Sequence, residues 1–118
     1  MDKPTFNDFA GDTRAVLSID YKKRIIRADD GTHIKLTASE TTFLGLLAER
    51  RSECLSRDEL LSRNITGNDT NYRSLNVLIS RLRTKLETIT NNKVIDSVRG
   101  YGYSLGEDVE LLNAQASE

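Results

Sequence analysis

Four side chains in one stretch of the sequence have the chemistry to read the edges of DNA bases. Arg81 can form paired hydrogen bonds with O6 and N7 of guanine, and Asn76 can do the same with adenine. Val77 can contact the methyl group of thymine, while packing under the segment 62–70 is the alternative for this residue. Ser80 is small enough to allow close approach. We predict base contacts in the major groove from Asn76, Val77, Ser80 and Arg81.

The same stretch carries side chains suited to phosphate oxygens. Arg73, Arg83 and Lys85 are positively charged, and Thr84 adds a small hydroxyl group. Contacts with phosphates set the register of a protein on DNA but carry no sequence information. We predict phosphate contacts from these four residues. A solvated helix face, on which the charges have no partner, is the alternative.

The apolar residues between these side chains predict a helix over about 71–88. At 100° per residue, the apolar residues fall within about 60° of one direction. They are Leu75, Leu78, Ile79, Leu82 and Leu86. The candidate DNA-reading side chains lie on the opposite half of this helix or at its flank. Because a helix is about 11 Å across and the major groove about 12 Å wide, the segment predicts a recognition helix.

A β-hairpin is predicted over residues 94–105, with Gly100-Tyr101-Gly102 as its turn. Arg99 stands at the tip, and an arginine on a β-ribbon can enter the minor groove of A·T-rich DNA. A plain solvated turn residue is the alternative for Arg99. The two glycines close a hairpin and do not lead into a helix, so they do not form a nucleotide-binding fingerprint.

The elements that precede this helix and hairpin predict an α+β fold. Short apolar runs at 15–19, 24–28 and 33–36 predict three antiparallel strands. Capping-box patterns at Thr37–Glu40 and Ser56–Glu59 predict the starts of two helices. Three strands, three helices and a terminal hairpin are therefore expected in this order.

The net charge of the 118 residues is −1, which by itself speaks against a nucleic-acid partner. The distribution of charge along the chain changes that conclusion. Residues 73–103 hold six basic and two acidic side chains, a net charge of +4, and residues 104–118 hold four acidic side chains and no basic one. The predicted helix and hairpin are thus basic, and an acidic tail cancels their charge.

Little in the sequence supports an enzyme. His33 stands alone, Cys54 has no context for a low thiol pKa, and no Cys/His cluster has the spacing of a zinc site. We predict no catalytic activity, no metal and no cofactor, because no nucleophile and base can be paired. The apolar run at 43–48 is far below the roughly 18 residues of a membrane span. With one cysteine and no visible signal peptide, a cytoplasmic protein is expected.

Three stretches of the sequence, taken in order, carry a specific pattern. The first reads Leu36-Thr37-Ala38-Ser39-Glu40 with Phe43, Leu44 and Leu47, and the second reads Leu55-Ser56-Arg57-Asp58-Glu59-Leu60-Leu61. The third runs from Arg73 to Glu87 and is followed by Ile95-Asp96-Ser97-Val98-Arg99-Gly100-Tyr101-Gly102-Tyr103. Together they resemble the winged-helix DNA-binding domain of the OmpR/PhoB family of bacterial transcription regulators.

This resemblance implies a winged helix-turn-helix with a four-stranded N-terminal antiparallel sheet, a three-helix core and a C-terminal β-hairpin wing. A short strand around Cys54-Leu55 is the candidate for the fourth strand. The resemblance also implies minor-groove contacts from Ser97, Arg99 and Tyr101 in the wing. The loop of residues 62–71 matches the segment that contacts RNA polymerase in this family. Family members tend to bind direct repeats as tandem homodimers.

The expected organisation is a flexible lead-in at 1–14, a winged-helix domain at 15–105 and an acidic, partly helical tail at 106–118. We predict sequence-specific binding of double-stranded DNA by a bacterial transcription regulator. The recognition helix, about 71–88, enters the major groove, and the wing at 94–105 enters the minor groove. The alternative is a winged-helix protein–protein interaction module with weak or no DNA binding.

A receiver domain, which usually precedes this domain in the family, is about 120 residues long. Only 14 residues precede the first predicted strand. The chain is therefore expected to be either a stand-alone effector or the DNA-binding part of a longer protein.

Overall fold

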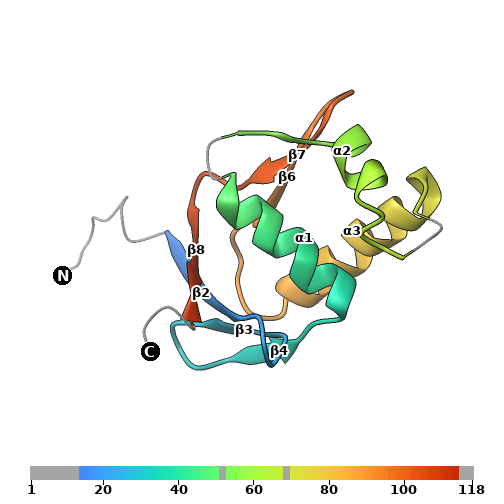
Figure 1. Ribbon diagram of the computed structural model, residues 1–118. Helices are drawn as coiled ribbons and strands as arrows, with labels where there is room; N and C mark the ends of the chain where they lie inside the picture. The colour runs from blue at the N-terminus through green and yellow to red at the C-terminus, as the bar shows by residue number, and fades with distance from the viewer. Residues whose placement is uncertain (1–13, 51–52, 68–69, 115–118) are drawn as a thin grey trace.

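Two small β-sheets flank three helices in the computed structural model, which describes residues 14–50, 53–67 and 70–114 (Figure 1). The larger sheet has the strand order β4-β3-β2-β8, and the smaller has the order β5-β7-β6. The strands are β2 (Ala15–Asp20), β3 (Ile25–Ala28), β4 (His33–Lys35), β5 (Leu55–Ser56), β6 (Ile95–Val98), β7 (Gly102–Leu105) and β8 (Val109–Asn113). The helices are α1 (Ala38–Glu49), α2 (Arg57–Ser62) and α3 (Tyr72–Leu86).

The three strands predicted near the N-terminus are confirmed, and they pair in the antiparallel sense. Ile26 pairs with Ile19 on one side and with Ile34 on the other. Leu17, Ile19 and Ile26 are almost fully buried, because the inner face of this sheet packs against the helices. The alternation of buried and exposed side chains is the two-residue period that a half-buried strand requires.

The fourth strand of this sheet is β8, so the prediction of an acidic, partly helical tail after residue 105 is wrong for Val109–Asn113. β8 runs parallel to β2, with Val109 opposite Ala15 and Leu111 opposite Leu17. Val109 and Leu111 are only 3% and 4% exposed. Asp108 and Glu110 alternate with Val109 and Leu111. The acidic composition of this stretch therefore did not indicate that it forms a strand. Residues 1–13 and 115–118, predicted to lie in the lead-in and the tail, lie outside the described ranges.

The short strand predicted around Cys54-Leu55 exists as β5, but it does not belong to the N-terminal sheet. Leu55 pairs with Tyr103 and Ser56 pairs with Gly102 in the wing sheet. An added Cβ at Gly102 would lie 2.1 Å from the Leu55 carbonyl oxygen, so only glycine allows the strands this close. β5 therefore ties the base of the wing to the start of α2.

Side-chain caps start all three helices. The Thr37 hydroxyl accepts a hydrogen bond from the Glu40 amide at 3.1 Å, and the Glu40 carboxylate accepts one from the Thr37 amide at 2.8 Å. This reciprocal pair confirms the first predicted capping box. Asn71 and Ser74 form a similar pair at the start of α3, which the sequence reading did not anticipate.

The second predicted box is only half formed. Ser56 caps the Glu59 amide at 3.0 Å, but the Glu59 carboxylate accepts from the guanidinium groups of Arg50 and Arg63. Hydrogen bonds from Arg50 lower the pKa of the Glu59 carboxyl below its ordinary value, which keeps it charged. This ion-pair group joins the end of α1 to α2.

The apolar stripe predicted for α3 forms the centre of the domain. All five of its apolar side chains are buried, and Leu75 and Leu82 are fully enclosed. They share one core cluster with Phe43, Leu44 and Leu47 of α1. Burying one face of α3 in this way leaves the opposite face for solvent or a ligand.

Leu111→Ala tests whether β8 is part of the folded domain. Removing a buried leucine side chain should lower the free energy of unfolding by about 2–4 kcal/mol in a urea titration. Leu112→Ala is the matched control, because the neighbouring side chain is 40% exposed and its loss should change stability by less than about 0.5 kcal/mol. Equal, small effects of both substitutions would show that this segment is a tail in solution.

Candidate nucleic-acid interface

The exposed face of α3 gathers the side chains predicted to read DNA. All four predicted base-contacting residues are exposed, together with two of the predicted phosphate-contacting residues. Val77 is 41% exposed, so it does not pack under the loop between α2 and α3. This exposed face consists of Arg73, Asn76, Val77, Ser80, Arg81 and Thr84.

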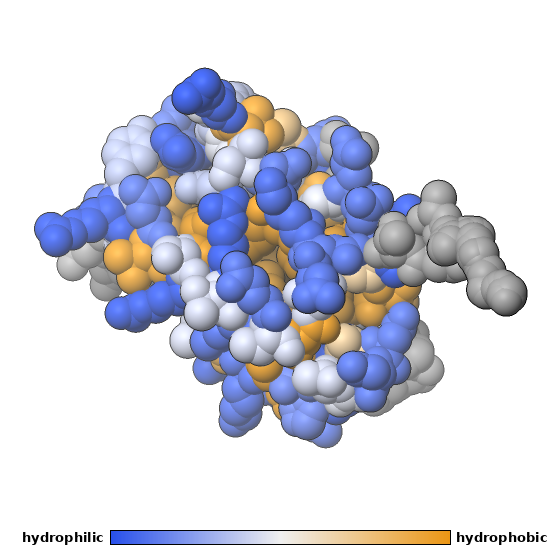
Figure 2. Space-filling view, turned by 180° about the vertical axis from the view of Figure 1, so that it is seen from behind, coloured by the Kyte–Doolittle hydropathy of each residue, from blue (hydrophilic) through white to orange (hydrophobic). Residues whose placement is uncertain are grey.

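An open hollow lies on each side of this exposed face. One, of about 550 Å³, lies between α3 and the start of α1 and is lined by Val77, Arg81 and Ser39 among others. The other, of about 410 Å³, lies between α3 and the wing and is lined by Ser80 and Ser97 among others. Seen from behind, the surface is largely hydrophilic, with apolar patches exposed between projecting polar side chains (Figure 2).

The wing carries two further predicted residues at its exposed tip. Arg99 is exposed, and Tyr101 is 52% exposed. The Tyr101 amide donates to the Val98 carbonyl at 2.9 Å, and Gly100 between them has a φ of 74°. This tight turn presents both side chains at the end of the hairpin.

Arg83 and Ser97, predicted to contact a phosphate and the minor groove respectively, contact each other. The Arg83 Nη2 donates to the Ser97 hydroxyl at 2.8 Å and to the Ile95 carbonyl at 3.0 Å. Arg83 is half-buried, whereas Ser97 is exposed. The pair links α3 to the wing, which the linear sequence does not reveal.

The contacts of Lys85 differ from those expected of the predicted phosphate ligand. Its Nζ lies 2.7 Å from a carboxylate oxygen of Glu40 and donates to the Lys35 carbonyl at 3.3 Å. Glu40 is only 2% exposed. A buried carboxylate needs a charged or hydrogen-bonding partner, and Lys85 supplies it. Its charge is therefore used inside the domain.

Arg57 is a candidate that the sequence reasoning missed. It lines the hollow between α3 and the wing, and its guanidinium carbon lies 5.9 Å from the centroid of the Tyr103 ring. Its Nε is buried without a hydrogen-bond partner. The sequence feature that could have indicated Arg57 is its positive charge in the first turn of α2, where the helix dipole disfavours cations. A local rule broken in this way often marks a functional residue.

The described residues offer little for other chemistries. No group of three or more His, Cys, Asp or Glu side chains in the described ranges is placed to hold a metal ion. His33 is exposed, with its Nδ1 3.4 Å from the Gly31 carbonyl oxygen, and Cys54 is a half-buried free thiol. Across the described residues, no helix has the length and apolar character needed to span a membrane.

Comparison with known families agrees with this geometry. The family described as "Transcriptional regulatory protein, C terminal" matches residues 31–105, which is more than half of the chain. The chain belongs to this family. The family comprises domains of transcription regulators rather than enzymes, and it is the OmpR/PhoB-type effector family that the sequence resembles.

One regulatory protein and two DNA-binding domains illustrate what the chain is similar to in sequence and in structure. The regulatory protein VirG of Agrobacterium fabrum (strain C58) is 35% identical over 96 residues, which are 80% of this chain and 38% of VirG. The DNA-binding domain of the response regulator AdeR, in complex with an intercistronic region, has a TM-score of 0.66 at 24% identity and covers 76% of this chain and 93% of its own. The Klebsiella pneumoniae RstA DNA-binding domain, in complex with the RstA box, has a TM-score of 0.58 at 33% identity and covers 75% and 88%.

These matches confirm the winged-helix fold, and they show how much of a regulator the chain represents. The chain spans about two fifths of VirG but corresponds to nearly the whole of each DNA-binding domain. The similarity is therefore to the effector part of a response regulator.

Lys85→Ala tests whether Lys85 serves the fold. It should lower the free energy of unfolding by about 2–3 kcal/mol, because it leaves the buried Glu40 carboxylate without its charged partner. Lys22→Ala is the control, since an exposed lysine should change stability by less than about 0.5 kcal/mol in the same urea titration. If both substitutions changed the free energy of unfolding equally, Lys85 would not stabilise the fold and would be available to contact phosphates.

Proposed function

We propose that this domain binds double-stranded DNA sequence-specifically as the effector part of a bacterial transcription regulator. The observation that carries the proposal is the composition of α3, which has no Asp or Glu among its 15 residues and exposes two arginines opposite its buried stripe. A helix face free of acidic groups can approach the bases of the major groove without repulsion from phosphates.

The middle of the exposed face reads bases in this proposal. Arg81 pairs with guanine, Asn76 pairs with adenine, and Val77 contacts a thymine methyl group. Ser80 lies on the same face, and its short side chain keeps the helix close to the groove. All four of these side chains are exposed, which supports this assignment.

The edges of the exposed face hold the phosphate backbone. Arg73 and Thr84 are exposed towards the two ends of α3, and Arg57 stands across the hollow between α3 and the wing. The wing enters the minor groove with Arg99 at its tip, and Tyr101 packs beside the sugars. Phosphate contacts on both sides of α3 would set its register in the groove.

The acidic residues that follow the wing do not oppose this arrangement, because they lie away from α3. Glu107, Asp108 and Glu110 belong to β8 and the segment before it. β8 lies across α1 from α3 (Figure 1). This acidic segment and α3 therefore lie on different sides of α1.

The proposal includes protein partners. RNA polymerase would be contacted through the loop of residues 62–71, whose support is the family resemblance and the exposure of Arg63 and Asn64. The same resemblance supports binding of direct repeats as a tandem homodimer. A DNA ligand is consistent with a location in the cytoplasm. Nothing on the described surface favours a protein-binding winged helix without DNA binding.

Selection from random DNA, followed by titration of the selected duplex with Arg81→Ala and wild-type protein, tests the proposal. At about 0.9 per neutralised phosphate, the two arginines assigned to phosphates, Arg57 and Arg73, predict a slope of log affinity against log salt of about −2. Arg81→Ala should cost about 1–3 kcal/mol on the selected site and relax preference at one base position.

Arg27→Ala provides the matched control for charge. Arg27 is an exposed arginine on β3, away from α3, so its loss should leave affinity and base preference unchanged. A selection that enriches no site, with an affinity that does not respond to salt, would contradict DNA binding. An equal loss in both variants would mean that bulk charge, and not the face of α3, carries the binding.

A further inference from the structure

We propose that Arg83 is a positioning residue that fixes the wing to the recognition helix, so that both meet DNA as one rigid unit. This inference rests on the proposed DNA binding. It also changes the role expected for Arg83, from a phosphate ligand to a brace between two DNA-reading elements.

The two acceptors of Arg83 lie along the outer strand of the wing sheet. β6 pairs with β7 on one side only in the described sheet, so its other edge has no strand beside it. The Val94 carbonyl accepts from the Gly106 amide, on the β7 side. Because successive carbonyls along a strand point in opposite directions, the Ile95 carbonyl points to the open edge. Arg83 satisfies that carbonyl and reaches Ser97 from the same Nη2 atom.

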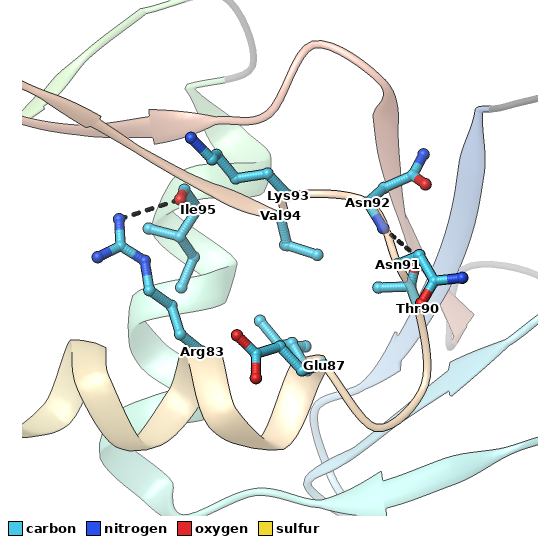
Figure 3. A pocket seen from close by; sticks show the side chains of 9 residues that line it. Arg83, Glu87, Thr90, Asn91, Asn92, Lys93, Val94 and Ile95 are labelled. Atoms are coloured by element: carbon cyan, nitrogen blue, oxygen red, sulfur yellow. Dashed lines mark hydrogen bonds between the residues drawn. The ribbon is translucent and has the colours of Figure 1, made fainter.

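Open hollows lie on both sides of the Arg83 side chain. On one side of Arg83 lies the 410 Å³ hollow that opens towards the DNA-reading face. On the other side lies a hollow of about 320 Å³, whose walls include Leu86, Val94 and Ile95 (Figure 3). Figure 3 shows the Arg83 side chain reaching from α3 to the Ile95 carbonyl at the mouth of this second hollow. Val94 and Ile95 are buried in the core, so packing anchors the base of β6. The hydrogen bonds from Arg83 add a direct link from α3 to the exposed Ser97, one step further towards the tip.

The position of the wing matters because Arg99 stands two residues beyond Ser97 at the tip. A strand rises about 3.3 Å per residue, so a tilt of β6 at its base is carried outward to the tip. If the tip were displaced, Arg99 would lose its contact with the minor groove even when α3 lies correctly in the major groove. Arg83 thereby couples the two halves of the binding site without touching DNA.

Arg83→Lys separates a brace from a phosphate ligand, since lysine keeps the charge, but its ammonium lies closer to the backbone than the Nη2 atom that reaches Ile95 and Ser97. For a brace, amide hydrogen exchange at β6 and β7 of the free protein should rise at least tenfold, with exchange in α1 unchanged. Hydroxyl-radical footprinting on the selected duplex should show loss of minor-groove protection next to the α3 site.

Arg27→Lys is the matched control, because Arg27 is exposed on β3, away from α3 and the wing. It should leave wing exchange and minor-groove protection as in the wild type. Ser97→Ala removes one acceptor and keeps the Ile95 carbonyl, so it should raise wing exchange by a smaller factor than Arg83→Lys.

Two results would overturn the inference. One is unchanged wing exchange in both Arg83→Lys and Ser97→Ala. The other is retained minor-groove protection in Arg83→Lys together with a salt slope that drops by about 0.9 in Arg83→Gln, the signature of one lost phosphate contact. Because hydrogen exchange is measured without DNA, a failure of the proposed DNA binding would be distinguished from a failure of the brace.

Discussion

The packing of one apolar stripe of α3 against α1 decides what the rest of the domain can do. Five leucine and isoleucine side chains of α3 are buried, and burying each such side chain stabilises the fold by about 1.5–3 kcal/mol relative to exposure. At that energy α3 cannot rotate about its axis. The stripe therefore selects which residues face outward, and the two arginines and the small side chains of that outer face follow from it.

Charged residues of α3 divide between the fold and the surface according to their angle from this stripe. Arg73 and Arg81 lie opposite the stripe and are exposed. Arg83 and Lys85 lie nearer to it, where each meets a neighbouring element: Arg83 meets β6 and Lys85 meets Glu40 of α1. Four positive charges on one helix thus have two different tasks. The basic segment has less charge available for phosphates than its net value of +4 suggests.

Local patterns predicted most of the fold, and long-range contacts account for what they missed. The three N-terminal strands, the Thr37 capping box and the stripe of α3 depend on residues close in sequence, and these were predicted correctly. β8 pairs with β2 across more than 90 residues of chain, and the partner of Lys85 is 45 residues away. A sequence reading without contacts has no access to such pairs. For the same reason, the sequence shows Arg57 only as part of a motif. Its position beside the wing is evident only from the fold.

The central claim is that the exposed face of α3 and the tip of the wing form one DNA-binding surface. A nuclear magnetic resonance titration of the ¹⁵N-labelled protein with the selected duplex tests it most directly. The largest amide shift changes should fall along α3 from Arg73 to Thr84 and at Arg99 and Tyr101, while β3 and β8 stay unchanged. Changes concentrated on the N-terminal sheet, with α3 unaffected, would contradict it.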